Sequence, residues 1–211
     1  MRGGLLSLIL GAVAAVSIAG LAKAQTLSDL YPEVATLVDG AGVANDQYGE
    51  SVALDGNTLV VGVPNSSAGR GLVRVFTRNG ASWSLQSTIE VGPPTYSFGE
   101  SVALDGDTLA VGSPSESVGG ISWYGVVRIF VRSGASWALQ ATLTLSDGAA
   151  FDYFGSVLAL DGNTLAVGVN FDDIGANQNA GSVRIFTRSG TTWTSEATLT
   201  AGDGMAEDFF G

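Results

Sequence analysis

Short runs of apolar and β-branched residues alternate with turn residues along the chain from about residue 48 onward. In the first stretch these runs predict four strands, at Ser51–Leu54, Thr58–Gly62, Leu72–Arg78 and from Trp83 to about Ile89. Asp55-Gly56 joins the first two strands and favours a tight hairpin, because both residues tolerate the positive φ of a type I′ turn. Asn79-Gly80 joins the last two strands. The pattern predicts a sheet of four antiparallel strands.

The third predicted strand carries apolar groups on both faces. Val73, Val75 and Thr77 lie on one face, whereas Arg74, Phe76 and Arg78 lie on the other. A strand with this alternation belongs to a sheet that is covered on both sides. The paired arginines recur at 128/132 and 184/188, where they form either a basic binding stripe or part of the scaffold. We favour the scaffold, with the stems covering Phe76, Phe130 and Phe186 and the heads reaching water or acids at the sheet edge.

The same unit occurs three times. YGESVALDGNTLVVGVP (48–64) returns as FGESVALDGDTLAVGSP (98–114) and FGSVLALDGNTLAVGVN (154–170), so the repeats span approximately 48–97, 98–153 and 154–209. Four antiparallel strands in a unit of about 50 residues are typical of a β-propeller blade. We therefore predict an all-β fold with about three propeller-type blades, in an incomplete or open propeller preceded by a strand near Glu33–Leu37. Such a chain is expected to expose apolar surface on its outermost blades, as a fragment or as part of a ring that a second copy completes.

Net charge and composition exclude some classes of binding partner and some kinds of site. The 211 residues contain 9 Lys and Arg against 20 Asp and Glu, a net charge of −11 that becomes −13 if Arg2 and Lys23 leave with residues 1–24. Such acidity disfavours nucleic acids and anionic membrane surfaces. The chain has no cysteine and no histidine, which excludes disulfides and thiolate zinc sites.

The N-terminus resembles a secretory signal. Arg2 precedes an apolar stretch that ends in Ala22-Lys23-Ala24, so we expect a signal peptide at 1–24 that is cleaved between Ala24 and Gln25. The alternative is an uncleaved anchor formed by Leu5 to Ala22. Cleavage predicts a secreted, extracellular or periplasmic protein without membrane insertion, since no later segment is apolar enough to cross a bilayer.

Two motifs in each unit resemble the FG-GAP repeats of integrin α-chain propellers and their bacterial relatives. Phe98-Gly99 is followed by Gly112-Ser113-Pro114, with a close variant at 48–64 and, at 154–170, a copy without the proline. The resemblance implies a ligand-binding or cell-adhesion module, which the signal-like N-terminus would make secreted or cell-surface. We expect no catalysis, because without histidine, cysteine or a mature lysine a serine lacks its usual base and Schiff-base chemistry is excluded. The resemblance also implies calcium loops between the first two strands, but the short hairpins here do not support calcium, and we predict no cofactor. Asp55, Asp105 and Asp161 are read as turn formers, and the weak metal candidates are Asp105, Asp107, Asp172 and Asp173.

Further aspartates precede the aromatic-glycine motifs, namely Asp39 and Asp46, Asp147 and Asp152, and Asp203 and Asp208. Their simplest role is to cap loops by accepting hydrogen bonds from nearby amides. A ring of metal ligands is the alternative, but Val91 and Tyr96 interrupt it in the second copy.

Because recurring residues build the scaffold, we expect ligand binding where the copies differ. The loops between the second and third strands differ most, and they supply the candidate ligand-binding residues Trp123, Tyr124, Phe171, Asp172 and Asp173. Aromatic rings beside acids suit a carbohydrate or a basic protein segment, although Trp123 and Tyr124 also fit a role in covering a blade edge. The competing functions are a glycoside-acting enzyme that uses paired carboxylates and a purely structural repeat protein.

Overall fold

The computed structural model describes residues 36–38, 40, 42–92 and 96–211. The predicted signal peptide and its cleavage site, Asp39 and most of the strand expected near Glu33–Leu37 lie outside this part of the chain. Thr36 and Leu37 are described and are not in a strand.

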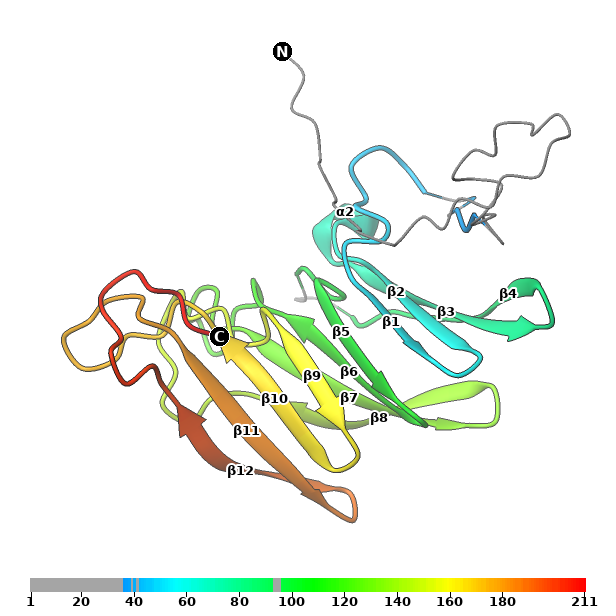
Figure 1. The fold of residues 1–211 in the computed structure, drawn as a ribbon. Helices are drawn as coiled ribbons and strands as arrows, with labels where there is room; N and C mark the ends of the chain where they lie inside the picture. Colours follow the sequence, from blue (N-terminus) through cyan, green and yellow to red (C-terminus); the bar gives the residue numbers. More distant parts are fainter. Residues whose placement is uncertain (1–35, 39, 41, 93–95) are drawn as a thin grey trace, which may run out of the picture. The chain divides into compact units, whose positions relative to one another are not determined.

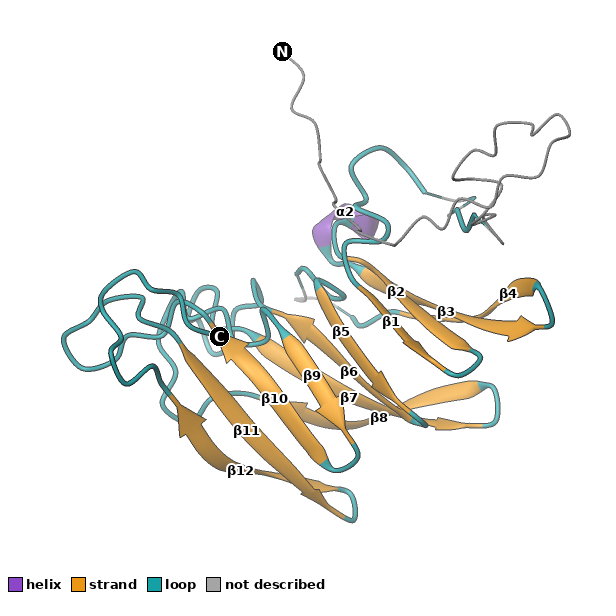
Figure 2. Ribbon diagram, in the orientation of Figure 1, coloured by secondary structure: helices purple, strands orange, loops and turns teal. Residues whose placement is uncertain are grey.

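The described residues form three four-stranded antiparallel sheets, in each of which the strands lie side by side in chain order (Figures 1 and 2). Blade 1 contains β1 (Val52–Asp55), β2 (Thr58–Val63), β3 (Leu72–Asn79) and β4 (Ser82–Ile89). Blade 2 contains β5 (Ser101–Asp105), β6 (Thr108–Ser113), β7 (Val126–Ser133) and β8 (Ser136–Leu143). Blade 3 contains β9 (Leu158–Asp161), β10 (Thr164–Val169), β11 (Ser182–Ser189) and β12 (Thr192–Leu199).

This architecture confirms the predicted all-β class and its blades of four antiparallel strands. The strand boundaries in blade 1 differ from the prediction by one residue, as where β1 begins at Val52 rather than Ser51. The helical turn α2 (Ser66–Gly69) lies in the loop between β2 and β3. Among all the residues that the structure describes, no helix is long and apolar enough to cross a bilayer.

The fourth strand of each blade, β4, β8 or β12, contains a β-bulge at the same place. The register with the third strand shifts at Val75/Phe76, Ile129/Phe130 and Ile185/Phe186. The unpaired residue of the bulge is Gln86, Gln140 or Glu196. A bulge increases the local twist of the strand, so all three blades bend alike.

Apolar side chains fill the space between neighbouring blades. We call the side of a blade that contacts the next blade its outgoing face, and the opposite side its incoming face. One core joins the outgoing face of blade 1 to the incoming face of blade 2, and it includes Val60, Val73, Val75, Val102, Leu109 and Phe130. The second core joins blades 2 and 3 through Ala110, Val127, Ile129, Leu165, Phe186 and Trp193. Blade 2 is therefore covered on both sides, as the alternation in the third strand predicts.

Polar contacts join the blades at the end where the tight hairpins lie. Asp55 accepts a hydrogen bond from the Gly106 amide of blade 2 at 2.8 Å, and Asp105 accepts one from the Gly162 amide of blade 3 at 2.6 Å. Arg132 donates to Thr58 at 2.7 Å, and Arg188 donates to Thr108 at 2.9 Å. The aspartates predicted to form turns thus also cap the turn of the following blade.

The arginine pairs are part of this scaffold, as predicted. The second arginine of each pair lies over a tryptophan ring, with Arg78 over Trp83 at 5.6 Å, Arg132 over Trp137 at 5.3 Å and Arg188 over Trp193 at 5.2 Å. Of the first arginines, Arg128 forms a bidentate ion pair with Glu116, each contact being 2.7 Å. These contacts occupy the guanidinium groups within or between the blades.

The backbones of neighbouring blades approach closely at a glycine that precedes each third strand. Gly71, Gly125 and Gly181 have φ values of +83°, +87° and +81°. A Cβ atom on Gly125 would overlap the backbone of Phe154, the aromatic residue that begins the next unit. Glycine is needed there for both its conformation and its size.

Candidate ligand-binding site

Five aromatic rings contact one another in series. The loops that carry them lie at the end of the blades opposite the tight hairpins (Figure 1). Their centroids are separated by 5.2 Å between Trp123 and Phe151, 5.5 Å between Trp123 and Tyr153, 4.9 Å between Tyr153 and Phe171, and 5.1 Å between Phe171 and Phe209. We call these residues the aromatic row. They come from the β6–β7 loop, the β8–β9 connection, the β10–β11 loop and the segment after β12.

Four residues of the aromatic row have left-handed backbone conformations, with φ of +50° at Trp123, +73° at Phe151, +56° at Tyr153 and +53° at Phe209. Bulky side chains seldom adopt such φ values. At Tyr153 and Phe209 the loop before the aromatic-glycine motif imposes this conformation, because Gln47 and Ser97 occupy the same place at φ of +59° and +56°. The conformation therefore belongs to the repeat, whereas the aromatic ring is particular to the later copies.

Aspartate side chains hold this loop in shape. The carboxylates of Asp46, Asp152 and Asp208 accept hydrogen bonds from the amides three residues before them, those of Val43, Ala149 and Met205, at 2.8, 2.6 and 2.6 Å. The predicted capping role is confirmed for these three residues. Asp147 has a different role, since it forms an ion pair with Arg184 at 3.0 Å.

The predicted binding residues separate into a surface set and a buried set. Trp123 is 45% exposed, Phe171 is half-buried within the row, and Asp173 is exposed. Tyr124 is buried and its hydroxyl donates to the Leu145 carbonyl. Asp172 is buried as well, accepting hydrogen bonds from Ser182 at 2.5 Å and from Arg184 at 2.8 Å. Trp123 and Phe171 do not touch directly, because Tyr153 lies between them.

A buried ionic network supports the loops beneath the row. Burial raises the pKa of Asp152 to about 6; the Ala149 amide opposes this shift, and the negative charges of Asp172 and Asp173 add to it. Burial opposes the charge of Arg184, but hydrogen bonds to Asp147 and Asp172 outweigh it and raise the pKa of the guanidinium. The pKa of the Tyr153 hydroxyl is raised by burial and by the nearby carboxylate of Glu100. The Arg184 guanidinium is thus already paired, with Asp147 and with Asp172.

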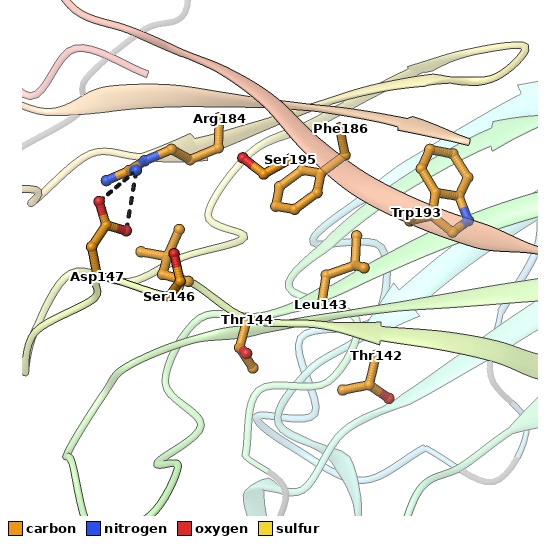
Figure 3. A pocket seen from close by; sticks show the side chains of 10 residues that line it. Thr142, Leu143, Thr144, Ser146, Asp147, Arg184, Phe186, Trp193 and Ser195 are labelled. Atoms are coloured by element: carbon orange, nitrogen blue, oxygen red, sulfur yellow. Dashed lines mark hydrogen bonds and ion pairs between the residues drawn. The ribbon is translucent and has the colours of Figure 1, made fainter. Parts of the chain in front are cut away.

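A cavity of about 260 Å³ lies between β8 of blade 2 and the outer strands of blade 3, with Arg184 and Asp147 at one end and Trp193 at the other (Figure 3). Ser195 lines this cavity and occupies the position that Leu85 and Leu139 hold in the other blades. The smaller side chain leaves room between the sheets. No residue of the aromatic row lines the cavity.

The weak metal candidates have other partners. Asp105 caps Gly162, Asp107 forms an ion pair with Arg132 at 2.7 Å, and Asp173 accepts a hydrogen bond from the Asn179 amide at 2.8 Å. Within the described residues, no group of three acidic side chains is placed to hold a metal ion.

Sequence reasoning did not identify Phe151, Tyr153 and Phe209 as candidates. Their signal was available, because Gln47, Ser97, Tyr153 and Phe209 align directly before the aromatic-glycine motifs, and only the last two are aromatic. All three contact Trp123 or Phe171. These contacts depend on how successive blades pack against each other, and the strand pattern of a single repeat does not predict that packing.

The chain matches the FG-GAP repeat family over residues 31–76 and 137–186. Both matched regions end at the phenylalanine in the middle of a third strand, Phe76 in β3 and Phe186 in β11. The chain carries FG-GAP repeats. Its three sheets are consistent with blades of an FG-GAP propeller. No curated protein matches the chain.

Proposed function

We propose that this FG-GAP repeat protein is a secreted binding module without catalytic activity, and that its ligand lies on the aromatic row. The observation that carries the proposal is the row itself, which is partly exposed to solvent and belongs to residues that the copies do not share. Trp123, Phe151 and Phe209 are 45%, 52% and 42% exposed. Apolar rings that are costly to expose favour a role in recognition.

A neutral glycan is the ligand class that this surface suits best. Aromatic rings offer flat apolar faces to the C–H groups of sugars, and a few polar side chains beside them fix the orientation of the hydroxyls. Asp173 and Gln178 are exposed in the same β10–β11 loop as Phe171. The acidity of the chain disfavours glycans that are themselves anionic.

A basic protein segment is the second candidate, because carboxylates accompany the rings. Glu100 lies close enough to Tyr153 to affect the pKa of its hydroxyl, and Asp173 is exposed. A lysine or arginine side chain is attracted both to aromatic faces and to such acids. The two classes differ in their response to salt, since screening weakens binding of a charged segment but not of a neutral sugar.

Arrays of neutral glycans and of basic peptides, followed by titration of the best binder at low and high salt, test this function. Burial of one large aromatic side chain contributes about 1.5–3 kcal/mol, so Trp123→Ala should weaken binding by more than about tenfold. The matched control is Asn57→Ala, an exposed polar residue at the hairpin end. Loss of binding in the control with no change in Trp123→Ala would place the ligand elsewhere and contradict the proposal.

Export is a separate part of this proposal. It rests on the signal-like pattern of residues 1–24. Protein recovered from the periplasm or medium of a secreting host should begin at Gln25. Recovery of the chain in the cytoplasm with Met1 or Arg2 at its start would contradict export.

A further inference from the structure

The cleft between blades 2 and 3 lies where blade 3 departs from the repeat (Figure 3). In each blade, the phenylalanine of the third strand lies directly opposite one residue of the fourth strand. That residue is Leu85 in blade 1 and Leu139 in blade 2, but Ser195 in blade 3. The shorter side chain leaves a cavity of about 260 Å³ that Phe186 lines. The cleft is therefore particular to one blade pair and is not required by the repeat.

The cleft combines an apolar floor with a polar rim. Leu143 of blade 2 and Phe186 of blade 3 belong to the core between these blades and also line the cleft. Ser146 and Ser195 line it too, and both are exposed. A ligand in the cleft thus meets apolar groups on one side and hydroxyl groups on another. Small-molecule sites have this composition, because a few polar groups fix the orientation of a ligand that lies on an apolar surface.

An ion pair lies at one end of the cleft. Nη1 of Arg184 donates to both carboxylate oxygens of Asp147, at 3.2 and 3.0 Å. Arg184 is also paired with Asp172, at 2.8 Å. Asp172 is the counterpart of Glu116, which pairs with Arg128 in blade 2. Asp147 is therefore a second carboxylate on an arginine that the repeat already pairs, and its side chain is 60% exposed.

The charges at this end favour a neutral ligand that carries hydroxyl groups. A carboxylate offers about four acceptor sites, so Asp147 retains sites for a donor beside those that Arg184 occupies. An anion is repelled by Asp147, and a cation is repelled by the adjacent guanidinium. A hydroxyl group avoids both costs, because it is uncharged and both donates and accepts hydrogen bonds. A sugar ring carries such groups along its edge and C–H groups on its faces.

We propose that this cleft binds one neutral sugar residue. Its hydroxyl groups donate to Asp147 and bond to Ser146 or Ser195, and its C–H groups lie against Leu143 and Phe186. A volume of about 260 Å³ is just below the roughly 300–1,000 Å³ of pockets for drug-sized ligands, so the cleft takes one ring and not a chain. The site is separate from the aromatic row and does not depend on the function proposed above.

Isothermal titration calorimetry tests the proposal with D-glucose, D-galactose, D-mannose and N-acetyl-D-glucosamine, each as the free sugar and as its methyl glycoside. We expect saturable, millimolar binding of at least one of these sugars, weak because a small ligand makes few contacts. Equal binding of its methyl glycoside indicates the terminal residue of a glycan as the source, whereas loss indicates a free monosaccharide. Failure of every free sugar and every glycoside to bind would overturn the proposal.

Three variants test whether the bound sugar lies in the cleft. Ser195→Leu restores the residue of the other blades and narrows the opening, so it should weaken binding by more than about tenfold without lowering the free energy of unfolding. Ser195→Ala keeps the opening and should weaken binding by about fivefold or less, through the loss of one hydrogen bond. Asp147→Asn removes the charged acceptor and should weaken binding by more than about tenfold, while Arg184 keeps its pair with Asp172.

Two further variants are the controls. Thr194→Leu adds the same side chain as Ser195→Leu on the opposite face of β12, since Trp193 and Ser195 on either side of it line the cleft. Trp123→Ala changes the aromatic row. Neither control should change the affinity for the sugar. Equal affinity of Ser195→Leu and wild type would overturn the cleft site. If that result came with loss of binding in Trp123→Ala, the sugar would lie on the aromatic row and the function proposed above would stand.

Discussion

The hairpin end and the loop end of the blades are built from different kinds of residue. At the hairpin end the copies use the same side chains in the same contacts, as where Asp55 and Asp105 cap the turns of the following blades. At the loop end the backbone also repeats, since Gln47, Ser97, Tyr153 and Phe209 share one left-handed conformation, but the side chains do not. The difference indicates that the repeated residues maintain the fold, and it supports the proposal that the unrepeated rings bind a ligand.

The largest effect is expected where the repeated backbone brings two blades into contact. Gly125→Ala combines a positive φ with overlap against the backbone of Phe154, and we expect it to lower the free energy of unfolding by about 2–4 kcal/mol. Gly120→Ala is the matched control, because Gly120 has the same φ of +87° and open space around it. The control should cost about 1 kcal/mol, the strain of the backbone alone. Equal losses in urea denaturation would show that the close approach of the blades contributes nothing.

A smaller effect is expected from the capping aspartates of the hairpin end. Asp105→Ala leaves the Gly162 amide without its acceptor and should cost about 1 kcal/mol of stability. Asp161→Ala changes the same position in blade 3, where no capped amide is present within a single described chain, and should change stability little. Both variants are compared by thermal denaturation at low protein concentration. A greater loss from Asp161→Ala would contradict the role assigned to these contacts.

The strand pattern and the repeats predicted the blades well, because strand alternation and Asp-Gly turns are local signals. They also predicted the capping role of Asp46, Asp152 and Asp208, which depends on amides only three residues away. The aromatic row was predicted only through Trp123 and Phe171. Its other members join these two across the boundary between units, and the burial of Tyr124 and Asp172 depends on packing that no single loop sequence specifies.

The pH dependence of stability tests the buried acid below the aromatic row. The pKa of Asp152 is raised to about 6 in the folded protein, against about 3.9 for an unfolded aspartate. Between these values the folded chain binds a proton that the unfolded chain lacks, so this group's contribution to stability is present below about pH 4 and lost as the pH rises through 6. Asp152→Asn retains an oxygen for the Ala149 amide but should lose this dependence. Parallel pH profiles for wild type and variant, measured by urea denaturation, would contradict the raised pKa.

A small change in stability, with a large change in binding, is expected from Tyr153→Ser. Serine already occupies the equivalent position at Ser97, with the same φ of +56°, so the repeated backbone should tolerate the substitution. The variant loses the ring that joins Trp123 to Phe171, at a cost of about 1 kcal/mol of stability. Its affinity and its unfolding free energy, measured side by side with those of wild type for the glycan or peptide that the arrays identify, test the division between repeated and unrepeated residues most directly. Loss of binding by more than about tenfold in a chain of nearly unchanged stability is the predicted result. Undiminished binding together with a large loss of stability would show that the aromatic row is part of the fold and contradict the proposed function.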